Sequence, residues 1–252
     1  MEQLTETYEL LTYAEQPPPE DDVRVIIDNG WPRFMLFDPL ADKYWTRLHT
    51  YFPQYQFALY DDEMRVVAIC NSVPVVWDGN ADSLPAAGWD WALESGVQGY
   101  ENGTTPNALS AISITVARSH VGKGVSPHAV QGLRRVTRQN GLTHLIAPVR
   151  PSLKSMYPLI PMERYIHWKT DEGSPFDPWL RVHWRAGARI ARVCLESMCI
   201  VGTIDQWEEW ASMMFPESGL YIVPYALTPV DINVEADTGR YIEPNVWMVH
   251  SL

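Results

Sequence analysis

The spacing of apolar residues along the chain predicts alternating helices and strands. Between Pro39 and Tyr51 apolar residues recur every three or four positions, which is typical of a helix with one buried face, and Asp38 is a suitable N-cap. The same spacing predicts further helices over residues 88–103, 127–140, 152–157, 163–168, 177–187 and 204–214. Two apolar runs, 56–60 and 66–70, flank a short acidic stretch and predict an antiparallel hairpin, whose second strand continues to Trp77.

The centre of the chain predicts a crossover unit. Residues 108–116 have the composition of a buried strand, a glycine-containing loop follows, and residues 142–149 predict the next strand. The helix between them is expected to have Ser126 as its cap and Pro127 in its first turn, and to end at Gly141. Such units join parallel or splayed neighbouring strands, so we expect a mixed α/β fold.

The sequence predicts three parts of the chain: an N-terminal arm, a core that contains the crossover unit, and a C-terminal extension. Residues 1–35 predict an N-terminal arm, with a helix over Thr5–Glu15 that ends before three prolines and a strand over Val23–Ile27. Residues 36–168 predict the core of the protein. Residues 169–252 predict a β-rich C-terminal extension packed on that core, with extended segments over 189–201 and 220–249.

Composition excludes several classes of protein. Hydrophobic residues make up 46% of the chain and charged residues 20%, which is ordinary for a globular protein and excludes wholesale disorder. No apolar run approaches the roughly 18–20 residues that span a bilayer, and the acidic N-terminus lacks the pattern of a signal peptide. The three cysteines show no CxxC spacing and the seven histidines no metal-binding motif, so we expect a cytoplasmic protein without a metal.

The distribution of charge predicts a site for one discrete anion. The net charge is −12, which disfavours nonspecific binding to nucleic acid. Residues 118–154 nevertheless carry seven Lys and Arg side chains and no Asp or Glu. A helix with a solvated basic face explains the segment equally well on charge alone.

The loop at the start of this basic segment supports the anion site. Gly122 and Gly124 allow backbone conformations that other residues avoid, and the loop leads directly into a helix N-terminus with unpaired N–H groups. Lys123 and Arg118 lie close by in sequence. These features favour a phosphate or diphosphate group as the ligand of the site. Neither the Walker loop nor the GxGxxG fingerprint of dinucleotide-binding proteins is present.

In this context the chain resembles the GNAT superfamily of acyl-CoA-dependent N-acyltransferases. The hallmark of that family is a strand, then [Q/R]-x-x-G-x-[G/A], then a helix; here Ser113–Val116 precede the stretch Val121–Ser126, and Gly124 matches the first required glycine. Val121 replaces the usual Gln or Arg, and Ser126 replaces the last small residue. The resemblance covers roughly residues 38–165 and implies a GNAT-like fold, with a central mixed, splayed β-sheet flanked by helices.

The resemblance also implies how the acyl donor binds. Acyl-CoA or acetyl-CoA is the expected co-substrate, and the departures at Val121 and Ser126 leave an acyl-pantetheine on a carrier protein as an alternative. The thioester and pantetheine are expected to lie along the strand before the loop, where a bulge frees an N–H group for the thioester carbonyl. The residues expected to bind the donor are Ile114, Thr115, Val116, Val121, Gly122, Lys123, Gly124, Val125 and Ser126.

Aminolysis of a thioester requires two proton transfers, and the sequence offers candidates for both. The family usually places a Tyr after the next strand to protonate the departing sulfur, whose thiol pKa is about 8–9. Tyr157 is in about that place and Tyr165 is its competitor. Glu163, the only acid between Arg118 and Lys169, is the candidate general base or ammonium anchor. His183 and His120 are further base candidates, and a mechanism that uses water needs none of them.

These observations predict an N-acyltransferase that moves an acyl group from acyl-CoA, or from carrier-protein pantetheine, to a primary amine. The acceptor is expected to be a metabolite, an amino acid or a peptide, and the acidic remainder of the chain favours a cation. A possible further partner is an acyl carrier protein. The alternative is a non-catalytic GNAT-fold module that binds acyl-CoA or a partner. Thioester hydrolysis is a third reading, but no Ser/His/Asp spacing supports it.

Overall fold

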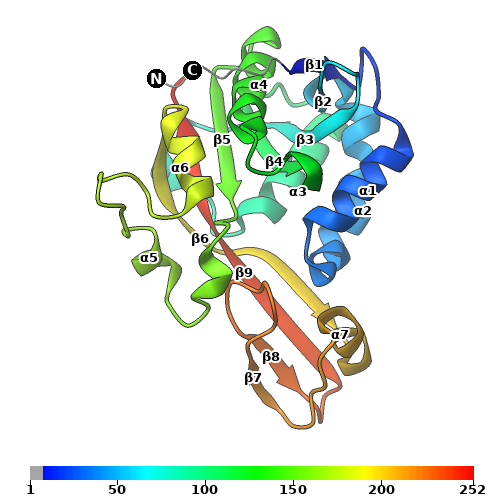
Figure 1. The fold of residues 1–252 in the computed structure, drawn as a ribbon, viewed down its shortest axis with the longest axis vertical. Coiled ribbons are helices and arrows are strands. Elements are labelled where there is room, and N and C mark those ends of the chain that lie inside the picture. Colours follow the sequence, from blue (N-terminus) through cyan, green and yellow to red (C-terminus); the bar gives the residue numbers. More distant parts are fainter. Residues whose placement is uncertain (1–7) are drawn as a thin grey trace.

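Residues 8–252 are described in the computed structural model, and their strands join into a single mixed sheet (Figure 1). The strands are β1 (Glu9–Thr12), β2 (Phe57–Tyr60), β3 (Val66–Val75), β4 (Ala108–Val116), β5 (His144–Val149), β6 (Ala188–Gly202), β7 (Gly219–Tyr221), β8 (Val230–Asn233) and β9 (Thr238–His250). The helices are α1 (Glu20–Gly30), α2 (Pro39–Tyr51), α3 (Gly88–Glu101), α4 (Val125–Gln139), α5 (Met162–Tyr165), α6 (Pro178–Arg185) and α7 (Ile204–Ala211). Helices α2 and α3 pack against each other, as do α4 and α6, and both pairs cover the sheet.

The sheet opens between β4 and β5. Its strand order is β1-β2-β3-β4-β5-β9-β8-β7, and β6 also pairs with β9. All neighbours are antiparallel except β4 and β5, which are parallel and pair over only three residues, from Ala108↔His144 to Ser110↔Ile146. Beyond Ser110 the two strands diverge. This confirms the mixed, splayed sheet that the crossover unit predicts.

The long strand β9 connects the C-terminal segments to the rest of the sheet. Its last residues, Val246–His250, pair with β5 on one edge and with β6 on the other. Its first residues, 238–240, pair with β8 on the edge that β5 occupies further along. Residues 241–245 therefore lie between β5 and β8 with no strand partner on that edge among the described residues. The domain boundaries at residues 35 and 168 stay predictions.

Several elements form as the local sequence predicts. Helix α2 begins at Pro39, and the Asp38 carboxylate accepts hydrogen bonds from the N–H groups of Leu40 and Ala41, both at 2.9 Å. The hairpin of β2 and β3 is confirmed, although β3 ends at Val75 rather than at Trp77. Helix α4 begins at Val125, not at Pro127. Its N-cap is Gly124 rather than Ser126, because a φ of +83° at Gly124 ends the preceding turn.

Two predictions in the N-terminal arm are wrong. Residues 9–12 of the predicted helix form β1, which extends the sheet by pairing with β2; residues 5–7 lie outside the described part of the chain. The run Val23–Ile27 lies in helix α1 rather than in a strand. Three acidic residues after Pro19 occupy the first turn of α1, where they interact favourably with the helix dipole. Ile26 is buried while Val25 is 57% exposed, so the helix buries one face of an apolar run.

Candidate active site

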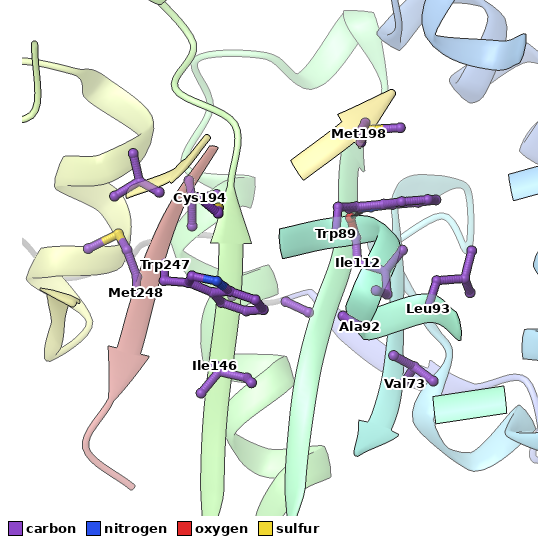
Figure 2. Close-up of a cluster of buried hydrophobic side chains, with 14 of the residues drawn as sticks. Val73, Trp89, Ala92, Leu93, Ile112, Ile146, Cys194, Met198, Trp247 and Met248 are labelled. Carbon is purple, nitrogen blue, oxygen red and sulfur yellow. Dashed lines mark hydrogen bonds between the residues drawn. The ribbon is translucent and has the colours of Figure 1, made fainter. Parts of the chain in front are cut away.

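A cavity of about 850 Å³ occupies the space where β4 and β5 diverge. Its walls are formed by β4 from Ala111 to Val116, by β5 from Ala147 to Val149, by residues 29–32 at the end of α1, and by side chains of α6 and β9. Trp89, Ile112 and Met198 also line it, and the three side chains lie close together in Figure 2. The cavity thus has a backbone edge on one side and aromatic and apolar side chains on the other.

A bulge in β4 lies beside this cavity. Asn71 and Ser72 of β3 pair with Ser113 and Ala111, so Ile112 is the extra residue in β4. The indole Nε1–H of Trp89 donates a hydrogen bond of 2.9 Å to the Ile112 carbonyl. From Ala111 onward β4 does not pair with β5, so main-chain groups of β4 along the cavity are available to an extended ligand.

The glycine loop and the start of α4 form one end of the cavity. Gly122 and Gly124 both have a φ of +83°, which explains why glycine occupies these positions. No described side chain caps α4, so N–H groups of its first turn are free to bind a ligand. Arg118, Val121 and Ser126 line the cavity, whereas Gly122, Lys123, Gly124 and Val125 do not. Free amides and a nearby guanidinium fit the diphosphate of a CoA donor.

The expected donor strand is part of the same wall. Ile114, Thr115 and Val116 all line the cavity. Thr115 also accepts a hydrogen bond of 2.9 Å from the indole of Trp31, which attaches the segment after α1 to β4. The structure therefore brings together five of the nine predicted donor-binding residues, and it places three of the others in the adjoining turn and Val125 at the start of α4. Their role in binding the donor stays a prediction.

The two predicted catalytic residues do not line the cavity. Tyr157 lies in an aromatic cluster with Tyr165, Trp168 and Phe176, at ring-centroid distances of 5.0–6.1 Å. Tyr165 donates a hydrogen bond of 2.9 Å to Asp177, the N-cap of α6. Glu163 is exposed on α5. The catalytic roles of Tyr157 and Glu163 stay predictions.

A buried ionic network that the sequence analysis missed lies at the other end of the cavity. The carboxylate of Glu243, which is 0% exposed, accepts hydrogen bonds from Arg150 Nε at 2.8 Å, Tyr241 at 3.0 Å and Asn245 at 3.0 Å. Arg150, Glu243 and Asn245 line the cavity. The Glu243 carboxylate raises the pKa of the Arg150 guanidinium, against the effect of burial. The available signal was a single acid within the apolar run 241–250.

A pair of histidines also reaches the cavity. His183 Nδ1 and His250 Nε2 are 3.0 Å apart, and His183 lines the cavity from α6. Burial lowers the pKa of His183 well below its ordinary value and that of His250 to about 4. Both imidazole rings are therefore neutral at pH 7. In the hydrogen bond between them, one of the two nitrogens carries the hydrogen and donates it to the other. His120, the other base candidate, lies outside the cavity lining.

A second cavity of about 330 Å³ adjoins the first and shares four of its lining residues. Three tryptophans, Trp31, Trp45 and Trp89, contribute to its walls, and Asp42 is its only charged lining residue. Asp38 is the N-cap of α2 and Asp90 follows Trp89 in α3; burial raises the pKa of Asp38 to about 6 and that of Asp90 to about 8. One carboxylate oxygen of each is buried without a hydrogen-bond partner among the described residues. The aromatic faces and the carboxylate of Asp42 together favour a cation here.

Comparison with known proteins places these features in a family. The chain is 34% identical over 275 residues to the arginine N-acetyltransferase avaD of Aspergillus versicolor, covering 97% of this chain and 94% of the relative. The loading GNATL domain of CurA from Lyngbya majuscula superposes with a TM-score of 0.57 at 16% identity, over 97% of this chain and 98% of that one. The GphF GNAT-like decarboxylase in complex with isobutyryl-CoA gives 0.56 at 14% identity, with the same coverage. No model of a protein family matches the chain.

The fold and its splayed site define a GNAT-like acyltransferase architecture. The sequence similarity goes further: the chain belongs to the GNAT superfamily and is an N-acyltransferase. Among residues 8–252 no helix is long and apolar enough to cross a membrane. The described residues also contain no group of three His, Cys, Asp or Glu side chains arranged to hold a metal ion.

Proposed function

We propose that the protein transfers an acetyl group from acetyl-CoA to an amine of arginine. The observation that carries this proposal is the 34% identity to an arginine N-acetyltransferase, which extends over 97% of the chain. The lining of the smaller cavity supports it. Its walls carry three tryptophans and Asp42 as the one charged side chain, so a cationic acceptor is attracted there while a neutral one is not.

The donor belongs at the opposite end of the large cavity. The first-turn N–H groups of α4 and the Arg118 guanidinium bind the diphosphate, and Ile114–Val116 provide an edge along which a pantetheine arm lies. Val121 and Ser126 border the same region and contribute main-chain contacts. An acyl-pantetheine on a carrier protein presents the same arm without the nucleotide, so competition between CoA and a carrier tests which donor the protein uses.

The reaction needs few protein groups. The neutral amine of the acceptor attacks the thioester carbonyl carbon, a C–N bond forms, and the electron pair of the breaking C–S bond moves to sulfur. The proton lost by nitrogen is delivered to the thiolate to give the free thiol. The role assigned to Tyr157 is this last protonation, and the role assigned to Glu163 is to accept the amine proton. A kcat lowered roughly 100-fold or more in Tyr157→Phe supports that role, whereas an unchanged kcat leaves Tyr157 a packing residue.

Citrulline provides a sharp test of the acceptor, because its neutral ureido group has the shape of the arginine guanidinium without the charge. We expect release of free thiol from acetyl-CoA with arginine and at least 10-fold lower kcat/KM with citrulline. If acetyl-CoA stabilises the protein against thermal unfolding but no amine causes release of free thiol, the protein is a binding module instead. Turnover with citrulline as fast as with arginine would refute the cationic acceptor.

The proposed location is the cytoplasm. Cys70 and Cys194 are buried free thiols and Cys199 is unpaired as well, which suits a reducing compartment. Fractionation of cells that express the tagged protein tests this location.

A further inference from the structure

The loop between β7 and β8 holds an aromatic side chain at the large cavity in a strained conformation. Tyr225 has a φ of +69°, a region that costs a residue with a Cβ free energy and persists only where the surroundings enforce it. We refer to residues 222–228 as the mouth loop. Tyr225 lines the 850 Å³ cavity and is 68% exposed, whereas the two residues that follow it, Ala226 and Leu227, are buried.

Three side chains from other elements hold the main chain of the mouth loop. Arg150 Nη2 donates a hydrogen bond of 2.6 Å to the Tyr225 carbonyl. Lys154 Nζ, on a side chain that is 0% exposed, donates one of 2.7 Å to the Leu227 carbonyl. The Leu227 N–H donates in turn to the Tyr241 hydroxyl at 2.8 Å. The Tyr225 carbonyl and the chain at Leu227 are therefore fixed, which explains how the positive φ is maintained.

Two of the three anchors of the loop also belong to the buried network. Arg150 and Tyr241 both donate to the Glu243 carboxylate, so the position of Tyr225 depends on that ion pair. The charge of Arg150, which lines the cavity, is matched by Glu243. Lys154 does not line the cavity, and burial lowers the pKa of its ammonium to about 8. The exposed phenol ring of Tyr225 therefore lies beside a paired guanidinium and offers its face to a cation.

The mouth loop lies away from the groups that bind the donor. Strands β7 and β8 lie at one end of the molecule and α4 at the other (Figure 1). The diphosphate-binding groups belong to α4, so the mouth loop lies nearest to the part of the cavity left for the acceptor. We propose that Tyr225, held by Arg150, Lys154 and Tyr241, is an acceptor-binding residue whose ring contacts the cationic group of the amine substrate. This inference rests on the proposed function for the identity of that substrate.

Steady-state kinetics with both substrates tests the inference. Tyr225→Asn removes the ring and keeps a residue that adopts a positive φ readily, so folding is preserved. We expect its KM for arginine to rise roughly 3- to 30-fold and its KM for acetyl-CoA to stay unchanged. Tyr225→Phe is expected to retain the wild-type KM for arginine, because it keeps the ring. Leu220→Ala, at a 72% exposed position of β7 outside the cavity, is the matched control.

Two results would overturn the inference. One is a KM for arginine in Tyr225→Asn equal to that of the wild type, and the other is a rise confined to the KM for acetyl-CoA, which would assign Tyr225 to the donor. Failure of the proposed function has a different signature, because wild-type protein then releases no thiol with arginine. The same variants are then compared with the best amine of a panel, and an unchanged KM for that amine overturns the inference on Tyr225 alone.

Discussion

Replacing Glu243 by Gln tests the buried network at the centre of the site. The substitution keeps the shape of the side chain and removes its charge. Oε2 of Glu243 accepts from Arg150 and Tyr241, and Oε1 accepts from Asn245. A glutamine has one acceptor oxygen for these three donors, so its amide N–H group must face one of them. The Arg150 side chain, which is 18% exposed, is then left without a counter-charge.

The expected loss of stability follows from that uncompensated charge. Removing one partner of a buried ion pair costs about 3–5 kcal/mol, and we expect this loss for Glu243→Gln and for Arg150→Met. Removing both partners together leaves no buried charge unpaired. The double variant is therefore expected to be more stable than the sum of the two single losses implies, by about 1–3 kcal/mol.

Urea unfolding at pH 7, followed by tryptophan fluorescence, measures these free energies; the chain contains 11 Trp residues. Arg24→Met is the control, because the Arg24–Asp21 pair is exposed and is expected to contribute nothing measurable. Single losses that add in the double variant within about 0.5 kcal/mol would refute the argument, because additivity means that the two side chains do not interact.

Three further predictions concern other parts of the structure. Gly124→Asp is expected to raise the Kd of acetyl-CoA at least 10-fold by placing a carboxylate at the α4 N-terminus, whereas Gly141→Asp, at a φ of +72° after the same helix, should leave Kd unchanged in calorimetry. Burial raises the pKa of Asp90 from 3.8 to about 8, so the folded protein retains a proton that the unfolded chain releases, and stability declines as pH rises between these values. Asp90→Asn should make that decline smaller in urea unfolding between pH 6 and pH 8, above the pKa of about 6 of Asp38; an equal decline in both proteins would contradict the assignment. Gly239→Ala places a Cβ 2.2 Å from Trp207 and is expected to cost about 1–3 kcal/mol in the same assay, and a neutral effect would mean that the indole has room to move.

Local signals were sufficient for the elements that carry the donor site. Helix α2 follows from Asp38 and the apolar spacing after it, and the unit from β4 to β5 follows from a strand, two glycines and an amphipathic helix. Local signals failed in the N-terminal arm. The run Val23–Ile27 has the composition of a strand, but the acidic first turn and burial of one face make it helical.

By itself, then, the sequence determined that this is a mixed α/β protein with a glycine loop suited to a diphosphate at a helix N-terminus. Those features depend on residues within about a dozen positions of one another, where helix caps and periodicity act. Only the tertiary structure decided that Glu243, Arg150 and Tyr225 meet at one cavity and that Tyr157 lies outside it. These residues come together because β9 pairs with β5 and with β8, and the pairing of β9 with β5, far apart along the chain, leaves no periodic signal in the sequence.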